Sequence, residues 1–327
     1  MPFMPDFWKR RGKLSEALLP LAFLYGGAVR LRHAWTRPYR APVPVVCVGN
    51  LVVGGAGKTP AALLVARRLM AHGRRPHFLT RGYGGTLRGP VRVDPDRHDA
   101  DAVGDEALLL AAEAPTWVAA NRRKGAKAAA DAGAEAIVMD DGFQNPTLHK
   151  DLSLLLVDGP FGLGNGRVVP AGPLREPLRA GLARADAAVV VGLPVAGLEA
   201  RVRPLLGERP MLHGRFHAGA AERELAGERL VAFAGIGRPD KFFGMLANLG
   251  ARVLHAYPFA DHYPYAETDI GPILAEARNL GAVVVTTAKD AVRLPADYQP
   301  LVKVVQITLE PDSPGTLDAL LDGALSG

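Results

Sequence analysis

A glycine-rich segment that ends in lysine and threonine is the first feature of this sequence that could carry chemistry. It consists of Val52, Val53, Gly54, Gly55, Ala56, Gly57, Lys58 and Thr59. In a phosphate-binding loop, or P-loop, backbone N–H groups face the phosphates and the lysine neutralises the charge of the β- and γ-phosphates. The threonine hydroxyl can ligate Mg²⁺. We therefore predict that this segment binds the phosphates of a nucleotide, with ATP as the expected one.

The sequence on either side of this segment has the form that a P-loop requires. An apolar run before it predicts a buried strand over 43–48, and a helix is predicted after it over 59–72. Pro60 suits the first turn of that helix, where its missing N–H costs little. The strict P-loop pattern begins with glycine, and this chain has Val52 there. A glycine-rich turn between a strand and a helix is the alternative interpretation.

Two adjacent aspartates, Asp140 and Asp141, follow an apolar run that predicts a strand over 136–139. A carboxylate at the end of a strand beside a P-loop is the usual acid on the Mg²⁺ side of a nucleotide site. Because neighbouring side chains point to opposite sides of an extended chain, we expect one of the two to serve the metal. A turn rich in aspartate and glycine is the alternative.

Three further segments carry residue types suited to catalysis, and each has a structural alternative. Asp105 and Glu106 follow a glycine at a predicted helix start, where they could equally cap the helix. His262 lies in a proline-bounded loop, and a single histidine in a loop is usually a surface residue. Arg81, in the glycine-rich segment 80–85, could reach an anionic ligand, or the segment could be a flexible turn.

Apolar runs of strand length alternate with alanine-rich helical stretches through the first two thirds of the chain. Strands are predicted over 43–48, 76–79, 117–119, 136–139, 152–157 and 187–191, and helices over 59–72, 105–114 and 122–132. This alternation predicts an α/β fold resembling P-loop NTPases, with a mostly parallel sheet covered by helices on both faces. Residues 160–182, rich in glycine, proline and arginine, predict a long functional loop.

A second, smaller α/β unit is predicted in the last third of the chain. Its strands are expected over 230–234, 252–255, 283–286 and 302–308, and its helices over 241–249 and 268–280. The boundary falls within 205–228. We therefore divide the chain into an N-terminal segment at 1–42, a P-loop domain at 43–215 and a smaller domain at 216–327.

The net charge of +6 is concentrated at the start of the chain. Residues 1–44 contain eight basic and two acidic side chains, and the rest of the sequence has equal numbers of each. A neutral body with a basic head is not the pattern of a nucleic-acid-binding protein, so we expect no nucleic-acid partner. The single cysteine, Cys47, excludes a disulfide within the chain and is expected to be a small buried hydrophobe.

The basic head surrounds 13 uncharged residues at 17–29, which are too few to cross a bilayer. Three interpretations compete: a signal peptide, a helix packed on the protein's own core, and a helix lying on an anionic membrane surface. In the last case Phe7, Trp8 and Phe23 would enter the membrane while lysine and arginine contact headgroups. Pro20 should break or bend any helix in this segment.

Taken together, these segments resemble the tetraacyldisaccharide 4′-kinase family. The matching blocks, in the family's order, are VGNLVVGGAGKTP (48–60), LTRGYGG (79–85), VGDEALLLA (103–111), ANRRKGA (120–126), DDGFQN (140–145), GPLREP (172–177), FAGIGRPDKFF (233–243), FADHYPY (259–265) and TTAKDAVRL (286–294). The blocks cover most of the chain. The family carries threonine or valine at the first P-loop position, so Val52 fits it. The chain departs from the family at Asn145, where histidine is common, which puts any role for this side chain in doubt.

The resemblance implies roles for individual residues. The match makes Asp105 the catalytic base and His262 its partner. Lys58 of the P-loop, which neutralises phosphate charge, is the third residue that we expect to be catalytic. It places acids around Mg²⁺ and the nucleotide at Glu106, Asp140 and Asp141, beside the Thr59 hydroxyl. It places Arg81, Tyr83, Gln144, Arg175 and Glu176 near the sugar or the phosphates. Since His262 belongs to the second domain, catalysis would depend on closure of the two domains, which keeps water from the γ-phosphate.

The resemblance also implies a substrate and a location. The expected reaction transfers the ATP γ-phosphate, with Mg²⁺, to the 4′-hydroxyl of a tetraacylated glucosamine disaccharide 1-phosphate, giving lipid IVA in lipid A biosynthesis. The expected protein is a monomer attached to the cytoplasmic face of the bacterial inner membrane without a spanning helix. Such a substrate keeps its acyl chains in the bilayer, so the basic and apolar head favours the interfacial helix once the family is considered.

Two other classes of protein are weighed against this one. A P-loop GTPase or metallochaperone would need a guanine-recognition segment or a Cys and His cluster, and the sequence has neither. The nearest segment to a guanine-recognition motif is 287–290, where Lys289 and Asp290 are adjacent. A soluble small-molecule kinase would share the P-loop, and its head would pack on its own core. Activity on acceptors in lipid micelles separates that case from a membrane enzyme.

Overall fold

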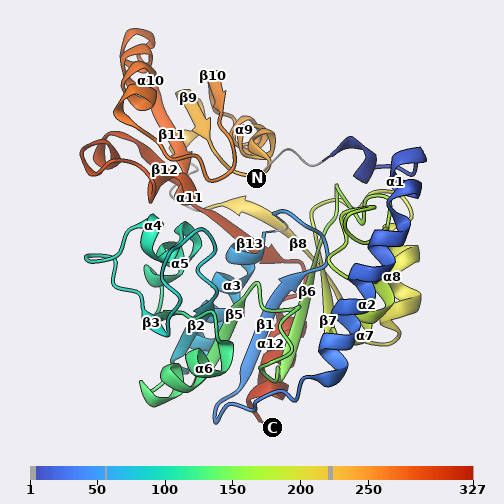
Figure 1. The fold of residues 1–327 in the computed structure, drawn as a ribbon. Helices are drawn as coiled ribbons and strands as arrows, with labels where there is room; N and C mark the ends of the chain where they lie inside the picture. Colours follow the sequence, from blue (N-terminus) through green and yellow to red (C-terminus); the bar gives the residue numbers. More distant parts are fainter. Residues whose placement is uncertain (1–4, 56, 220–223, 327) are drawn as a thin grey trace.

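The computed structural model describes residues 5–55, 57–219 and 224–326, so Ala56 of the predicted P-loop lies outside the described residues. Within these ranges the chain forms two sheets flanked by helices (Figure 1). The larger sheet has nine strands in the order β13-β8-β7-β6-β1-β5-β2-β4-β3. The smaller sheet has four strands in the order β10-β9-β11-β12.

The larger sheet is parallel except at its two edges. Its strands are β1 (Val45–Asn50), β2 (Pro76–Thr80), β3 (Val91–Arg92), β4 (Thr116–Val118), β5 (Ala136–Asp140), β6 (Leu152–Asp158), β7 (Ala187–Val191), β8 (Met211–Ala218) and β13 (Ile307–Pro311). The pairs β13–β8 and β3–β4 are antiparallel. Because β1 lies between β5 and β6, the P-loop after β1 is next to the carboxyl ends of both neighbours.

Helices cover both faces of this sheet, which confirms the predicted fold class. The helices of this part of the chain are α3 (Lys58–Ala71), α4 (Ala100–Val103), α5 (Asp105–Ala111), α6 (Arg122–Asp131), α7 (Leu178–Ala183), α8 (Leu198–Leu206) and α12 (Pro314–Leu325). Apolar residues of α3, α5 and α12 pack on one face, and those of α6, α7 and α8 pack on the other. The pattern of the sequence did not reveal α4, α7, α8, α12, β3 or β8.

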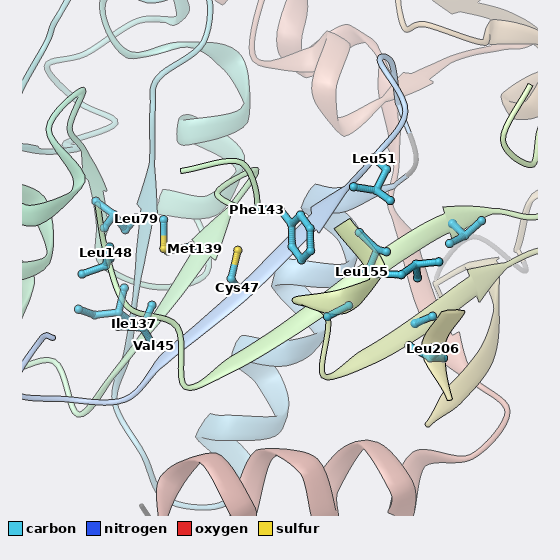
Figure 2. Packing of buried hydrophobic residues seen from close by; sticks show 14 of the residues in the cluster. Val45, Cys47, Leu51, Leu79, Ile137, Met139, Phe143, Leu148, Leu155 and Leu206 are labelled. Atoms are coloured by element: carbon cyan, nitrogen blue, oxygen red, sulfur yellow. The ribbon is translucent and has the colours of Figure 1, made fainter. Parts of the chain in front are cut away.

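The strand that leads to the P-loop is buried along its whole length, and its side chains alternate between the two layers of the core. Val45 and Cys47 belong to one layer, and Val46 and Val48 to the other. Figure 2 shows Cys47 among the apolar side chains of the first layer, near Met139 and Phe143. Burial raises the pKa of the Cys47 thiol to about 11, so this side chain behaves as the inert hydrophobe that we expected.

The smaller sheet is formed by a continuous part of the chain that is inserted between β8 and β13. It contains β9 (Arg229–Ala234), β10 (Arg252–Pro258), β11 (Val283–Thr287) and β12 (Lys303–Val305), with α9 (Pro239–Asn248), α10 (Glu267–Leu280), α11 (Ala288–Ala291) and the 3₁₀ helix η3 (Ala296–Leu301). The division at 215/216 therefore differs from the structure. β8 runs past it, and β13 and α12 return to the larger sheet.

The predicted strand over 302–308 is two strands in two different sheets. β12 pairs with β11 in the smaller sheet, and β13 pairs with β8 in the larger sheet. The chain crosses from one unit to the other at Gln306, between them. A single apolar run looks the same whether it stays in one sheet or passes between two, so the sequence pattern could not show this break.

The N-terminal head forms a 3₁₀ turn η1 (Asp6–Trp8) and two helices, α1 (Lys13–Ala17) and α2 (Leu19–Trp35). The two helices meet at Leu18, and Pro20 does not break α2: it occupies the first turn, where proline is tolerated, and α2 is 17 residues long. Gly26 of α2 packs closely against Pro177: a Cβ atom added to Gly26 would lie 3.6 Å from the proline ring. The buried Ser15 hydroxyl donates to the Ala171 carbonyl at 2.9 Å.

Candidate active site

The predicted P-loop joins the end of β1 to the start of α3, and the core fixes both of these elements. Gly57 precedes the helix with φ 78°, a left-handed conformation that favours glycine, and α3 begins at Lys58. Lys58 Nζ lies 3.5 Å from the Gly54 carbonyl oxygen and 3.6 Å from Asp141 Oδ2. The ammonium group therefore lies over the loop, at a helix N-terminus that favours bound anions.

Asp140 ends β5 beside the P-loop, and its side chain is buried. The Thr59 hydroxyl donates to Asp140 Oδ2 at 3.0 Å, and Asp140 Oδ1 has no hydrogen-bond partner among the described residues. Burial, together with the nearby charge of Glu106, raises the pKa of Asp140 to about 7, although Lys58 opposes the shift. A buried carboxylate oxygen without a donor is an arrangement that a cation would complete.

The neighbouring Asp141 faces a different set of groups. Its φ is 53°, and Arg175 Nη1 lies 2.7 Å from its Oδ1. Burial alone would raise the pKa of Asp141, but Lys58 and Arg175 outweigh burial and lower the pKa below its ordinary value. The two adjacent aspartates have different partners: Asp140 accepts from Thr59, and Asp141 pairs with Arg175 and Lys58. The alternation expected of an extended chain does not explain this, because β5 ends at Asp140 and Asp141 has a left-handed backbone. Which of the two serves the metal stays a prediction.

Asp105 is the first residue of α5, and its carboxylate points across the boundary between the two units. His262 Nδ1 lies 2.9 Å from Asp105 Oδ2, while the backbone N–H of Glu106 donates to Asp105 Oδ1 at 2.9 Å. Asp105 is only 3 % exposed. Burial favours its neutral form, but the hydrogen bond from His262 and the charge of Lys289 lower the pKa of Asp105 below its ordinary value, so it is ionised at neutral pH.

Two cations of the smaller unit complete this cluster, and sequence reasoning assigned a role to neither. Lys289 Nζ lies 3.5 Å from Glu106 Oε1, 3.9 Å from Asp105 Oδ2 and 3.2 Å from His262 Nε2. Arg293 Nε lies 3.6 Å from Asp105 Oδ2. Both residues belong to the block 286–294 that matches the family. The resemblance could therefore have pointed to them as site residues, although it gave neither a role.

The position of Lys289 also determines the form of the histidine. An ammonium group can only donate hydrogen bonds, so His262 Nε2 accepts from Lys289 and Nδ1 carries the proton toward Asp105. Burial would lower the pKa of Lys289, but the charges of Glu106 and Asp105 outweigh burial and raise it, which keeps the ammonium charged. The arrangement is therefore a carboxylate oriented by an imidazole N–H.

The comparisons with known proteins decide the family. The family model described as tetraacyldisaccharide-1-P 4′-kinase matches residues 14–326. The chain belongs to this family. Two proteins described as tetraacyldisaccharide 4′-kinase are each 54 % identical to the chain. The one from Rhodospirillum rubrum aligns over 99 % of this chain and 98 % of its own, and the one from Paramagnetospirillum magneticum over 97 % of each.

A solved structure supports the same conclusion at the level of the fold. The "apo" form of LpxK from Aquifex aeolicus in complex with ATP is 28 % identical to this chain, with a TM-score of 0.76. The match covers 96 % of this chain and 100 % of that one. The chain is therefore a kinase of the tetraacyldisaccharide 4′-kinase family.

Of the residues expected near the acceptor, Tyr83 and Arg175 lie beside the groups just described. The Tyr83 ring centroid is 5.6 Å from that of His262, and half of the Tyr83 side chain is exposed. Arg175 lies between Asp141 and Gln144, with 3.4 Å between its Nη1 and Gln144 Oε1. Arg81 is exposed and lies near Arg122.

Glu176 and Gln144 are held by the protein itself. Both carboxylate oxygens of Glu176 accept hydrogen bonds from Arg184, at 2.8 and 2.7 Å, and Glu176 is fully buried. Gln144 Nε2 lies 2.9 Å from the Asn50 carbonyl oxygen and 3.1 Å from Glu176 Oε1. Glu176 therefore helps to position the loop that carries Arg175, and its place near the substrate stays a prediction.

Asn145 and Arg122 each have a place in the local structure beside the site. Asn145 Oδ1 accepts from the backbone N–H of Thr147 at 2.9 Å and from its hydroxyl at 2.7 Å, which closes a turn. Asn145 also lines a cavity of about 760 Å³ with the arginines Arg32, Arg37 and Arg123. Arg122 is buried beside the site, and burial together with the charge of Arg81 lowers its pKa to about 10.

Replacing Lys289 by methionine should lower kcat by about 10-fold and change the KM for ATP by less than about threefold. The substitution keeps the length of the side chain but removes the donor to His262 and the cation beside Asp105 and Glu106. Lys303→Met is the control, because Lys303 is a partly exposed lysine of the same unit that pairs with Glu224 at 3.7 Å. If the two variants had the same kcat and KM, Lys289 would have no role in catalysis.

Proposed function

We propose that this site transfers the γ-phosphate of ATP to the 4′-hydroxyl of a tetraacylated glucosamine disaccharide 1-phosphate, giving lipid IVA. The observation that carries the proposal is the hydrogen bond between Asp105 of the larger unit and His262 of the smaller one, beside a P-loop. Glu106, the next residue, is close enough to Asp140 to raise its pKa, so the pair and the P-loop share one site.

In the proposed reaction the chain's residues orient the acceptor and move one proton. Asp105 accepts the proton of the 4′-hydroxyl as its oxygen bonds to the γ-phosphorus, and the bond from that phosphorus to the β–γ bridging oxygen breaks. The electron pair of that bond leaves with ADP. His262 holds Asp105 in place, and Lys58 neutralises charge on the phosphates. Arg175, Arg81 and Tyr83 line the acceptor side.

The residues present fit a magnesium ion. Thr59, Asp140 and Glu106 supply hard oxygen donors, and Asp140 Oδ1 is buried without a hydrogen-bond donor among the described residues. In the part of the chain that the structure describes, no group of three or more His, Cys, Asp or Glu side chains could hold a metal without other ligands. This agrees with P-loop sites, where a hydroxyl, one acid and phosphate oxygens share the ion. When bound, Mg²⁺ neutralises phosphate charge.

The decisive experiment is the transfer of ³²P from γ-labelled ATP to the disaccharide lipid in detergent micelles. We expect labelled lipid with ATP and Mg²⁺, much less with GTP, and none after EDTA unless Mg²⁺ is restored. Labelled inorganic phosphate without labelled lipid would identify a hydrolase instead. Equal transfer to a water-soluble sugar lacking acyl chains would favour the soluble-kinase alternative.

We also propose that α2 attaches the protein to the cytoplasmic face of the inner membrane. One side of α2 is buried on the protein, through Ala22 and Gly26, while Phe23 and Leu24 are 76 % and 72 % exposed. Leu21, Leu31 and Trp35 add further exposed apolar surface. In the described residues no helix is long and apolar enough to span a membrane. An exposed apolar face beside basic residues supports an interfacial position.

Replacing both Phe23 and Leu24 by serine should reduce binding to anionic vesicles by at least about 10-fold, because each removes roughly 2 kcal/mol of apolar transfer energy. Activity on a short-chain soluble acceptor should stay within about twofold. Point substitutions are better than deletion of the head, since deletion would remove the buried Ser15 contact. Leu193→Ser is the control, as Leu193 is 82 % exposed before α8. Unchanged vesicle binding would contradict the proposal.

A further inference from the structure

A second ionic cluster joins the two units on another side of the P-loop. Asp158 ends β6, the strand beside β1, and its carboxylate is buried. Arg238 and Lys241, at the start of α9 in the smaller unit, both pair with Asp158 Oδ2, and Lys241 Nζ lies 2.8 Å from it. The backbone N–H of Phe161 donates to Asp158 Oδ1 at 3.0 Å. The mechanism above uses none of these side chains.

Arg238 also reaches the P-loop itself. Its Nη2 lies 3.4 Å from the carbonyl oxygen of Gly55, the fourth residue of the eight-residue loop. The guanidinium carbon lies 5.5 Å from the centre of the Phe161 ring, which supports one face of the group. Since the loop's backbone N–H groups surround the phosphates, a cation at Gly55 lies beside the place where those phosphates bind.

We propose that Arg238 is a catalytic residue that contacts the terminal phosphate of the bound nucleotide. This inference rests on the proposed function and adds a residue to it. Guanidinium presents five donors, so Arg238 can bind a phosphate oxygen and stabilise the charge that develops on the β–γ bridging oxygen as its bond to phosphorus breaks. Lys58 supplies charge from within the loop, and Arg238 supplies it from the smaller unit.

Asp158 acts as the resting partner of this arginine. A buried carboxylate that loses its cation is costly, but Asp158 has a second cation, Lys241, at 2.8 Å, which can remain paired with it if Arg238 turns to the phosphate. Release of Arg238 therefore leaves no unpaired buried charge. Because His262 and Arg238 belong to the same unit, contact between Arg238 and the nucleotide would also favour the position of that unit in which His262 meets Asp105.

The test compares Arg238→Ala and Arg238→Lys with wild type, and Arg252→Ala serves as the control because Arg252 is an exposed arginine at the start of β10. Arg238→Ala should lower kcat by about 10²-fold, and Arg238→Lys should lose less. Binding of the β,γ-imido analogue of ATP should weaken by about 10-fold, whereas ADP affinity should change by less than about threefold. Arg252→Ala should match wild type.

The binding measurements keep this inference separate from the proposed function, because they need no acceptor. If wild type transfers no phosphate, the proposed reaction fails, while unequal loss of analogue and ADP affinity in Arg238→Ala still supports the contact. Asp158→Asn should tighten analogue binding, since it weakens the resting partner, and the double variant should bind like Arg238→Ala. The inference would be overturned if Arg238→Ala weakened the binding of ADP and of the analogue equally. It would also be overturned if Arg238→Ala and Asp158→Asn lost the same analogue affinity, because the two side chains would then form only a structural ion pair.

Discussion

Asp105→Ala should lower kcat by about 10³-fold and leave the KM for ATP nearly unchanged. A sugar hydroxyl is a weak nucleophile, and Asp105 is the ionised carboxylate that His262 and Lys289 hold in place. The site retains the P-loop and Lys58 when Asp105 is removed, so nucleotide binding should persist. Steady-state kinetics with the disaccharide lipid, at saturating acceptor, would measure the effect.

Asp99→Ala separates catalysis from helix capping. The Asp99 side chain caps α4 by accepting from the backbone N–H of Ala102 at 2.8 Å, a structural role near α5. Its loss should cost about 1 kcal/mol of stability and little activity. If Asp105→Ala were no slower than Asp99→Ala, Asp105 would be a helix residue and the base would have to be sought elsewhere.

Lys58→Met should lower kcat by about 10³-fold and also weaken ATP binding, because Lys58 acts on charge that grows in the transition state. The fold should tolerate the change. Asp141, which loses an ion pair at 3.6 Å, keeps Arg175 at 2.7 Å. Direct ATP titration together with steady-state kinetics would show the two effects separately.

The control for this variant is Arg68→Met on the same helix. Arg68 Nη1 pairs with Asp318 of α12 at 3.2 Å, so the substitution removes a cation and an ion pair from α3 without touching the P-loop. We expect it to retain near wild-type kcat. A similar fall in both variants would mean that α3 had been destabilised, and the catalytic role of Lys58 would not stand.

Local patterns predicted those parts of the site in which strand, loop and helix are consecutive. The P-loop and the Asp140–Asp141 pair were recognisable because a buried strand precedes each. The different partners of the two aspartates do not follow from the extended backbone that the sequence predicted, because Asp141 lies beyond β5 with a φ of 53°. Glu176 was placed among substrate residues by resemblance. Its two carboxylate oxygens accept from Nη2 of Arg184, a contact that depends on packing that no local pattern shows.

The contributions of the smaller unit could not be derived from the sequence pattern. Asp105 and His262 are 157 residues apart, and Asp158 and Arg238 are 80 apart, so their contacts exist only once the two sheets are arranged. The resemblance supplied the first pair. Lys289 stood in a matching block but had no expected role, since a lysine beside an aspartate reads equally well as a solvent-exposed charge.

Because one side of α2 packs on Pro177, the reaction velocity should depend on how concentrated the acceptor lipid is in the membrane surface. Pro177 is two residues from Arg175, so α2 contacts the segment that carries this proposed acceptor-side residue. A kinase attached by the opposite face of α2 would keep a fixed orientation at the surface and meet its acceptor by lateral diffusion. Its velocity would then follow the mole fraction of acceptor in the surface, and adding inert detergent or lipid at constant bulk acceptor would slow it.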